Sequence, residues 1–277
     1  MLVEAATFSM FGRTLHRLNP EIVQNMLYFN ERARIVFFGL PEIFSSKVAK
    51  ARRTLTETMK QFGSLPEIER VSQAWEHAPI DFLGASAYHC LTFHMRGNSL
   101  TYFRANSNEY NITFWPIAHL VSDVPLLEQV NKEIQGGWKD GELDIKHLCA
   151  NVPALDGAFH ESLRLNGGAM MSRKALEPAM IGDKLLQAGT NVLMPSRQLH
   201  MNEQVWGDIC KHFNSRRLLR IKVYSNTLHI VHFGVGLSYC PGRIMAKEQV
   251  YASIAILFRR FDVKLAQGLA RPKVPGS

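Results

Sequence analysis

The sequence contains few cysteines and no spacing among them that indicates a zinc site. Of its 277 residues, four are cysteine, at positions Cys90, Cys149, Cys210 and Cys240, and no two of them form a CxxC pair. A disulfide framework or a zinc-dependent fold is therefore not indicated. We expect the first three cysteines to be reduced, buried thiols, whereas Cys240 lies in a glycine-rich segment.

Long apolar runs are also lacking. A membrane-spanning helix needs about 20 consecutive apolar residues, and the best runs, Ile35–Leu40 and Ile254–Phe258, are much shorter. Residues 1–18 have no basic segment followed by an apolar one, so they do not indicate a signal peptide. The sequence by itself predicts no membrane-spanning segment and a location in the cytoplasm or at the periphery of a membrane.

The charge is basic, but no motif for nucleic acid accompanies it. The formal net charge is +8, and basic side chains gather in the last third of the chain. Such a surface can attract nucleic acid, an anionic membrane or an acidic protein, or it can be an ordinary solvated surface. Without an RNA- or DNA-binding motif, we do not expect a nucleic-acid partner. The content of 46% hydrophobic and 20% charged residues is typical of a folded globular chain.

Apolar residues recur at helical spacing through most of the chain. The first three predicted helices are separated from one another at Asn19-Pro20 and at Gly39-Leu40-Pro41. We found no internal repeat and no linker. The predicted helices cover residues 1–18, 20–38, 43–62, 87–120, 125–134, 153–165 and 241–261.

A short strand-rich stretch interrupts the helices. Met170-Met171, Met180-Ile181 and residues 191–194 have the composition of short strands, and Gly182-Asp183 lies between two of them as a turn. The pattern predicts a small sheet rather than a repeated alternation of strand and helix. The expected fold class is therefore mainly α with a small β-sheet.

The segment around Cys240 is the most informative part of the sequence. Gly234, Gly236 and Gly242 surround this one cysteine, and a long apolar helix follows at once. Glycine permits positive φ and a close approach of the backbone to a flat ligand. A position just before a helix N-terminus favours thiolate over thiol, which suits a nucleophile or a metal ligand. The alternative is a cysteine in a glycine-rich turn with no chemical role.

This segment resembles the haem-ligand loop of cytochromes P450, Phe-x-x-Gly-x-Arg-x-Cys-x-Gly. Phe233, Gly236, Cys240 and Gly242 match it at the right spacing, whereas Ser238 stands where the family has Arg. The resemblance implies that Cys240 is the axial ligand of the iron of haem b and that the other three matching residues contact the cofactor. The family's Arg meets a haem propionate, so that contact is missing here.

Glu161 and Arg164 match the Glu-x-x-Arg motif of the same family. Residues at i and i+3 share one face of a helix and can pair. The stretch Phe213-Asn-Ser-Arg216-Arg217 resembles the family's Phe-x-Pro-x-Arg, with Arg217 as the matching Arg. The resemblance implies a buried, structural network of Glu161, Arg164 and Arg217.

Three further positions fit the family pattern between these motifs. Arg173 falls where the family often places a propionate-binding Arg, and an exposed salt bridge is the alternative. His200 and Trp206 fit the family's His-x-x-x-x-x-Trp/Phe spacing. We expect both of them to be packing residues and not ligands.

The helix that handles oxygen in this family matches least well. The family's acid–alcohol pair is absent between Ala105 and Trp115, and the stretch is closest to steroid-hydroxylase, prostacyclin-synthase and related fungal branches. Asn108 aligns with their Asn, Glu109 replaces their Thr, and Thr113 follows. These are the candidate catalytic residues. The expected lining of an apolar pocket over the haem is Asn106, Ser107, Glu109, Tyr110, Thr113 and residues 168–171.

The resemblance covers nearly the whole chain but only part of the family's usual length. It implies one partial cytochrome P450 domain over residues 1–277, with a helical part, 1–135, and a second part, 136–277, that carries the Glu-x-x-Arg helix and the haem-ligand loop. The family's N-terminal segments and C-terminal hairpin have no counterpart. We therefore expect weak haem retention and poorly coupled turnover.

The activity implied is that of a haem-dependent monooxygenase. It would oxidise a hydrophobic small molecule, such as a steroid, a lipid or a fungal secondary metabolite, with O2 and with electrons from NADPH-cytochrome P450 reductase. Full-length relatives lie at the endoplasmic reticulum membrane. One alternative is a non-catalytic remnant of the family with weak or no haem binding. Another is a helical binding or scaffold protein in which Cys240 is inert.

Overall fold

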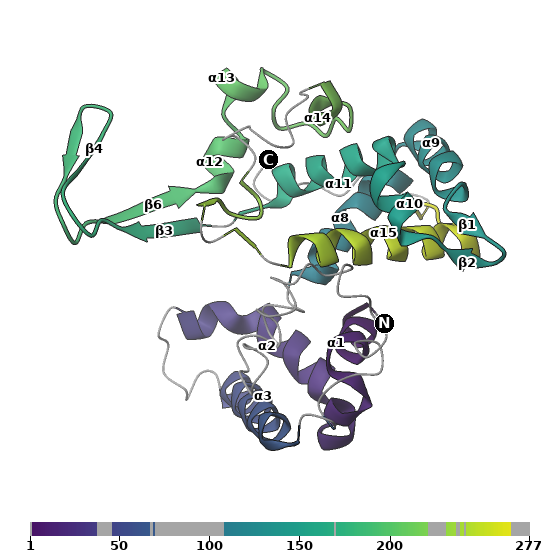
Figure 1. The fold of residues 1–277 in the computed structure, drawn as a ribbon, viewed down its shortest axis with the longest axis horizontal. Coiled ribbons are helices and arrows are strands. Elements are labelled where there is room, and N and C mark those ends of the chain that lie inside the picture. Colours follow the sequence, from purple (N-terminus) through teal and green to yellow (C-terminus); the bar gives the residue numbers. More distant parts are fainter. Residues whose placement is uncertain are drawn as a thin grey trace. The chain divides into compact units, whose positions relative to one another are not determined.

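The computed structural model describes residues 2–37, 46–66, 69, 108–168, 170–220, 231–236, 239–240 and 242–266. They form a mainly helical structure with small antiparallel sheets, as predicted (Figure 1). The chain divides into two compact units, one of residues 1–113 and 241–250 and the other of residues 114–240 and 251–277. The expected division of the chain at residue 135 stays a prediction.

Three helices make up the described core of the first unit: α1 (Leu2–Leu18), α2 (Ile22–Phe37) and α3 (Ser46–Ser64). They confirm the helices predicted over 1–18, 20–38 and 43–62. One feature of α1 was not predicted. At Gly12 the backbone leaves the helical region, with φ 64° and ψ −167°, so α1 is kinked there.

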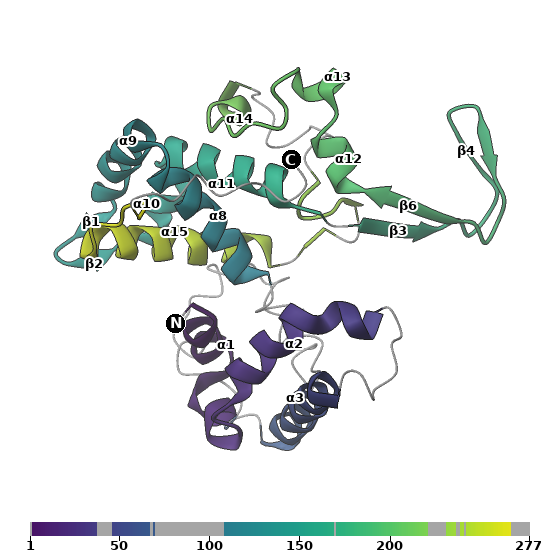
Figure 2. The same cartoon turned by 180° about the vertical axis from the view of Figure 1, so that it is seen from behind.

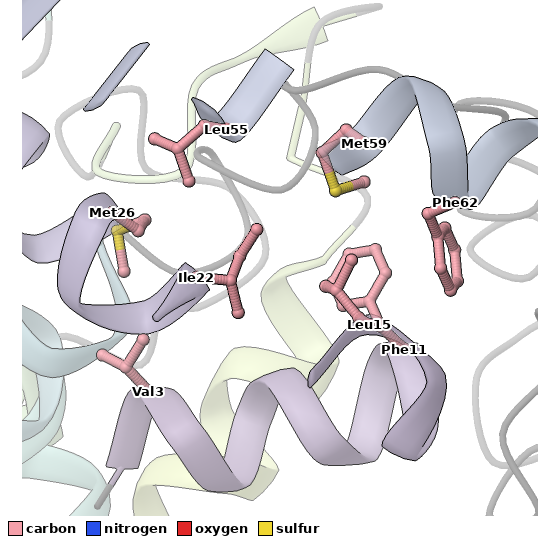
Figure 3. Packing of buried hydrophobic residues seen from close by; sticks show 8 residues of the cluster. All are labelled: Val3, Phe11, Leu15, Ile22, Met26, Leu55, Met59 and Phe62. Atoms are coloured by element: carbon pink, nitrogen blue, oxygen red, sulfur yellow. The ribbon is translucent and has the colours of Figure 1, made fainter. Parts of the chain in front are cut away.

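The core of this unit follows from apolar residues spaced one turn apart. Phe11 and Leu15 of α1 lie over α2 and α3, and the ring of Phe11 meets that of Phe62 edge to face at 5.8 Å between centroids (Figure 3). Asn19, in the turn between α1 and α2, donates its side-chain amide to the hydroxyl of Thr58 at 2.9 Å and so ties the turn to α3. The buried cluster consists of Val3, Phe11, Leu15, Ile22, Met26, Leu55, Met59 and Phe62.

In the second unit, α11 (Pro153–Asn166) is the central helix, and it is buried on nearly all sides. Its N-terminal amides are capped from α9 (Val124–Gln135), because the carboxylate of Glu133 accepts the N–H groups of Ala154 at 2.8 Å and Leu155 at 3.4 Å. On another side, Tyr251 of α15 (Arg243–Arg260) meets Phe159 edge to face, with ring centroids 5.5 Å apart. The predicted helices over 125–134, 153–165 and 241–261 are thereby confirmed.

The predicted small sheet is a hairpin arm. Strand β3 (Met170–Lys174) pairs antiparallel with β6 (Asn191–Pro195), and β4 (Ala179–Ile181) pairs with β5 (Lys184–Leu186) around a turn at Gly182, whose φ is 60°. Figures 1 and 2 show this arm extending away from α11 and α12 (Ser196–His200) within the second unit. The strands begin and end close to the predicted positions, and β5 was not predicted.

Several short elements were not predicted from the sequence. The helix predicted over 87–120 is described only in its last part, as α8 (Glu109–Val121). Within the described ranges, no helix has the length and apolar content to cross a membrane. The additional elements are β1 (Trp138–Lys139), β2 (Glu142–Leu143), α10 (Ile145–Ala150), α12, α13 (Glu203–Trp206) and α14 (Arg217–Arg220).

Candidate functional site

The loop around Cys240 folds back on itself through its backbone. The N–H of Cys240 donates to the carbonyl of Phe233 at 2.8 Å, and the N–H of Tyr239 donates to that of Gly236 at 3.1 Å. Gly234 and Gly236 have φ values of 81° and 62°, a region that side chains disfavour. The bonds and the two glycines therefore bring the cysteine back beside the start of the loop.

The reason for glycine at position 236 is its backbone and not crowding. A Cβ atom built on Gly236 would meet no heavy atom within 4 Å. Cys240 itself is half-buried, and α15 begins shortly after it, where the carbonyl of Gly242 accepts the N–H of Ala246 at 2.9 Å. Gly236 thus faces open space next to a cysteine that precedes a long helix.

Arg173 reaches this loop from the hairpin arm. It lies on β3 opposite Val192, and its guanidinium donates to the carbonyl of Val235 at 3.2 Å and to that of Ser172 at 2.8 Å. The side chain is exposed. A guanidinium is a cation that can pair with an anionic group beside the loop. The structure therefore brings Arg173 and the cysteine loop together.

Glu161 and Arg164 form a bidentate ion pair inside α11. Arg164 donates Nε–H to Oε2 of Glu161 at 2.9 Å and Nη2–H to Oε1 at 2.8 Å, and both side chains are fully buried. The remaining donors of Arg164 bind the carbonyls of His200 and Cys210, each at 2.6 Å. A buried charge is tolerated only when it is paired and hydrogen-bonded, and this guanidinium is both.

Arg217 joins the same carboxylate from α14. Its Nε–H donates to Oε1 of Glu161 at 3.0 Å. Its other donors bind the carbonyls of Trp206 at 2.8 Å, Ile209 at 2.9 Å and His212 at 3.2 Å. The structure thus brings together the three residues singled out in the sequence, and Arg217 also organises the irregular chain that leads to it.

His200 and Trp206 both pack around Arg164. The guanidinium lies over the indole ring of Trp206, 5.1 Å from the centroid, and the indole N–H donates to the carbonyl of Leu199 at 2.9 Å. The imidazole of His200 is buried, and burial, together with the positive charge of Arg164, lowers its pKa to about 4. His200 is therefore neutral at physiological pH.

The candidate catalytic residues lie at the start of α8. Glu109 and Thr113 are buried, and the Thr113 hydroxyl donates to the Glu109 carbonyl at 2.8 Å, while Asn108 is exposed. Burial raises the pKa of the Glu109 carboxyl to about 7. A carboxyl with this pKa exists in both protonation states near neutrality. Asn106, Ser107 and the Ser238 position lie outside the described residues.

The remaining residues of the expected pocket lining are placed as follows. Tyr110 accepts a hydrogen bond from the side-chain amide of Asn30 through its hydroxyl. Gly168 and Met170 are exposed, and Met171 is half-buried, at the point where α11 gives way to β3. A Cβ on Gly168 would meet nothing within 4 Å, so open space exists on this side of the second unit as well.

Two histidines close to the motifs were not singled out in the sequence. His160 directly precedes Glu161, His232 directly precedes Phe233, and Nδ1 of His160 lies 3.2 Å from Nε2 of His232. Asp156 lies one turn before His160 on α11 and accepts the hydroxyl of Tyr251 at 2.6 Å. No sequence pattern joins residues 72 positions apart. Their placement next to two recognised motifs was the one available signal.

Comparison with known proteins settles the family. The family model for cytochrome P450 matches residues 111–276, more than half of the chain. The chain belongs to the cytochrome P450 family. This match includes the segments that carry the Glu161–Arg164–Arg217 network and Cys240. The predicted membership is confirmed.

Similar P450 proteins come from fungi and animals. Cytochrome P450 monooxygenase calL of Penicillium decumbens is 23% identical over 294 residues, which cover 96% of this chain and 55% of the relative. Steroid 17-alpha-hydroxylase/17,20 lyase of Felis catus is 25% identical over 171 residues, covering 60% of this chain and 34% of the relative. The chain therefore spans about half, or less, of the length of these relatives.

A solved P450 structure shares the fold. A zebrafish cytochrome P450 determined with abiraterone matches at a TM-score of 0.64 and 17% identity, covering 92% of this chain and 61% of that one. The predicted fold class, a partial cytochrome P450 fold with a small sheet, is thereby confirmed. At this identity the likeness concerns the fold alone.

The family implies a haem cofactor, and the described residues fit one. A haem iron needs a single axial ligand from the loop side, so it does not require the clusters of three or more His, Cys, Asp or Glu that the described ranges lack. The backbone bond to Phe233 holds Cys240, open space borders Gly236, and the exposed guanidinium of Arg173 lies at the same loop. A thiol, a glycine that faces open space and a cation are groups that suit the iron, the ring and a propionate, respectively.

Proposed function

We propose that this P450 chain is part of a haem-thiolate monooxygenase that oxidises a hydrophobic small molecule. The observation that carries the proposal is the closed loop in which the N–H of Cys240 bonds the Phe233 carbonyl at 2.8 Å, with Arg173 bound to the same loop. The relatives that match include monooxygenases of fungi and a steroid hydroxylase by name. Steroids, lipids and fungal secondary metabolites are the proposed substrate classes.

The residues that would hold haem b are those of the loop and the arm. Cys240 would supply the axial thiolate, and Arg173 would pair with a propionate. Phe233, Gly236 and Gly242 would contact the cofactor. Bound haem with a thiolate ligand supplies the activation of O2 by two electrons and the transfer of one oxygen atom to the substrate.

Glu109 and Thr113 are the proposed proton-handling groups, and Asn108 is proposed to act beside them as the resemblance implies. A buried carboxyl with a pKa of about 7 is matched to proton transfer near neutral pH. The Thr113 hydroxyl is bonded to the Glu109 carbonyl, so it has to turn to relay a proton. We therefore propose that proton delivery takes place but is imperfectly coupled to product formation.

The redox partner and location are proposed from the family. NADPH-cytochrome P450 reductase would supply the electrons, and the working protein would act at the endoplasmic reticulum, as its full-length relatives do. The Glu161–Arg164–Arg217 network is proposed to be structural, since every nitrogen of both guanidinium groups donates to an oxygen of the protein. Neither His200 nor Trp206 is proposed as a ligand.

The test is a haem titration followed by turnover. The chain is titrated with haem, then supplied with the reductase, NADPH and a panel of steroids and fatty acids, with Cys240→Ala as the matched inactive variant. We expect haem uptake that is weak but depends on Cys240, and product formation that falls short of NADPH consumption. Product formation in Cys240→Ala, or no haem uptake at all, would overturn the proposal, and the latter favours a non-catalytic member of the family.

A further inference from the structure

Three histidines from different elements converge on the start of the cysteine loop. Nε2 of His232, in the loop, lies 3.2 Å from Nδ1 of His160 on α11. Nε2 of His200, at the end of α12, accepts the backbone N–H of Val231 at 3.2 Å. The ring centroid of His232 lies 5.3 Å from that of His160 and 6.1 Å from that of His200. The loop is therefore anchored to two helices at two adjacent residues.

His200 connects this anchor to the buried ion network. Its backbone carbonyl accepts Nη1–H of Arg164 at 2.6 Å, while its ring accepts the N–H of Val231. One residue thus joins the Glu161–Arg164 pair to the loop that carries Cys240. Because Val231 can only donate through its N–H, the proton on the neutral His200 ring lies on Nδ1.

The opposite end of the cluster is anchored to α15. Nε2 of His160 lies 3.8 Å from Oδ1 of Asp156, and this same oxygen accepts the hydroxyl of Tyr251 at 2.6 Å. His160 therefore lies between an acidic group on its own helix and His232 in the loop. The imidazole of His200 faces Arg164 from α11. The imidazole of His232 faces His160 from α11 and His200 from α12, and Asp156 faces His160.

The imidazoles of His200 and His232 are neutral, and each has one ring nitrogen without a hydrogen-bond partner among the described residues. Burial and the neighbouring His160 and His200 lower the pKa of His232 well below its usual range. Nδ1 of His232 and Nδ1 of His200 are both buried without a hydrogen-bond partner among the described residues. Leaving a buried polar group unsatisfied costs free energy, so packing alone would favour an apolar side chain at both positions. The other nitrogen of each ring, Nε2, has a partner and holds the loop in place.

Backbone hydrogen bonds connect the anchored residues Val231 and His232 to Cys240. The carbonyl of Val231, next to the anchored N–H, accepts the N–H of Gly234 at 2.9 Å, and the carbonyl of Phe233 accepts that of Cys240 at 2.8 Å. We propose that His160, His200 and His232 are positioning residues that latch the start of the cysteine loop and so fix the backbone that carries Cys240. This latch depends on the proposed function only in that Cys240 is taken as the haem ligand. The effect of the three histidines on the loop can be measured without haem.

The test is the rate at which Cys240 reacts with iodoacetamide in the full chain, read by mass spectrometry with Cys149 and Cys210 as internal references. His200→Leu and His232→Leu remove the latching nitrogens. His200→Gln and His232→Gln keep an amide that can replace Nε2. His212→Gln, at an exposed histidine, is the matched control.

Loss of one hydrogen bond changes a local opening equilibrium by about three- to tenfold. We expect the Leu variants to raise the Cys240 rate by about that factor, the Gln variants to restore most of it, and the control and reference cysteines to be unchanged. If a Leu variant unfolds, His200→Ala or His232→Ala takes its place, with the same expected rise in the Cys240 rate. Leu or Ala variants that fold and keep the wild-type Cys240 rate, or in which all cysteines react faster by the same factor, would overturn the latch.

The failure of the latch and that of the proposed function are distinguishable. With haem added, the latch predicts that the Leu variants hold a smaller thiolate-ligated fraction in the CO-bound spectrum than the Gln variants. If the chain takes up no haem, the alkylation rates alone decide on the latch. If haem ligation by Cys240 is normal in every latch variant and the alkylation rates are equal, the latch is wrong while the proposed function stands.

Discussion

Arg164 and Arg217 donate to the same oxygen, Oε1 of Glu161, at 2.8 Å and 3.0 Å. The backbone N–H of Asn214 reaches that oxygen too, at 3.2 Å, and the other carboxylate oxygen accepts Nε–H of Arg164 at 2.9 Å. The carboxylate of Glu161 therefore balances two guanidinium groups that come from α11 and α14. Removal of Glu161 leaves both guanidinium groups without their counterion, and removal of either arginine leaves the buried carboxylate with only one of its two charged partners.

Truncating this network should be severely and non-additively destabilising. Glu161→Ala, Arg164→Ala and Arg217→Ala should each lower the free energy of unfolding, by about 3–5 kcal/mol for the two fully buried residues, as measured by urea denaturation. Because the residues share one oxygen, Glu161→Ala combined with Arg217→Ala should cost less than the sum of the two single changes. Glu203→Gln is the control, since its pair with Lys211 is exposed and 3.7 Å apart and should be worth less than about 0.5 kcal/mol. Mild, additive effects in the network would contradict this account.

Gly236→Ala should strain the cysteine loop without any clash. The backbone has φ 62°, where an alanine costs about 1–2 kcal/mol, yet a Cβ there would meet open space. Gly182→Ala is the matched control, because Gly182 also faces open space with a positive φ of 60° but lies in the turn between β4 and β5. We expect lower stability for both variants and weaker haem uptake for Gly236→Ala alone. Equal haem uptake by the two variants would show that the backbone conformation of Gly236 does not matter for the cofactor.

Acid should destabilise the second unit through His200. Its pKa is lowered from 6.5 to about 4 in the folded chain, so the unfolded chain binds the proton first as the pH falls. The stability contributed is complete above pH 6.5 and is lost progressively toward pH 4, by about 3 kcal/mol. His200→Gln should flatten this acid limb in denaturation curves between pH 7 and pH 4, whereas His212→Gln should leave it unchanged. An acid limb of the same slope in His200→Gln would contradict the assignment.

The carboxyl of Glu109 should make the folded chain less stable as the pH rises, in contrast to His200, which does so as the pH falls. Its pKa is raised from 4.5 to about 7 by burial, so the folded chain keeps the proton longer as the pH rises. The stability contributed is complete below pH 4.5 and is lost as the pH rises to about 7, by about 3 kcal/mol. Glu109→Gln should remove this loss and gain stability relative to the wild type at pH 8. Glu128→Gln, at an exposed glutamate, should change nothing. Equal pH profiles of the three proteins would mean that Glu109 titrates as an exposed carboxyl.

The long elements were predictable because their packing leaves a periodic trace in the sequence. Phe11 and Leu15 of α1 are four positions apart, as are Ile22 and Met26 of α2, and all four fill a single core. Gly182 marks a tight turn between short apolar strands. The kink at Gly12 was missed because glycine inside an apolar pattern does not reveal which backbone conformation it takes.

The short elements and the histidine cluster were not predictable because long-range contacts create them. The chain before α14 is held by Arg217, which binds the carbonyls of Trp206, Ile209 and His212, and no periodicity marks such a segment. His160 and His232 meet across 72 positions. The motif residues themselves were predictable, whereas the partners that hold them appear only in three dimensions.

The most direct test of the central claim is the absorption spectrum of the reduced, CO-bound protein, compared between the wild type, Cys240→Ala and Cys149→Ala. A cysteine thiolate bound to haem iron gives a strongly red-shifted Soret band with CO, so its presence reports the ligand itself. We predict this band for the wild type and Cys149→Ala and its complete loss in Cys240→Ala. A red-shifted band that persists in Cys240→Ala would contradict the assignment of Cys240 as the haem ligand.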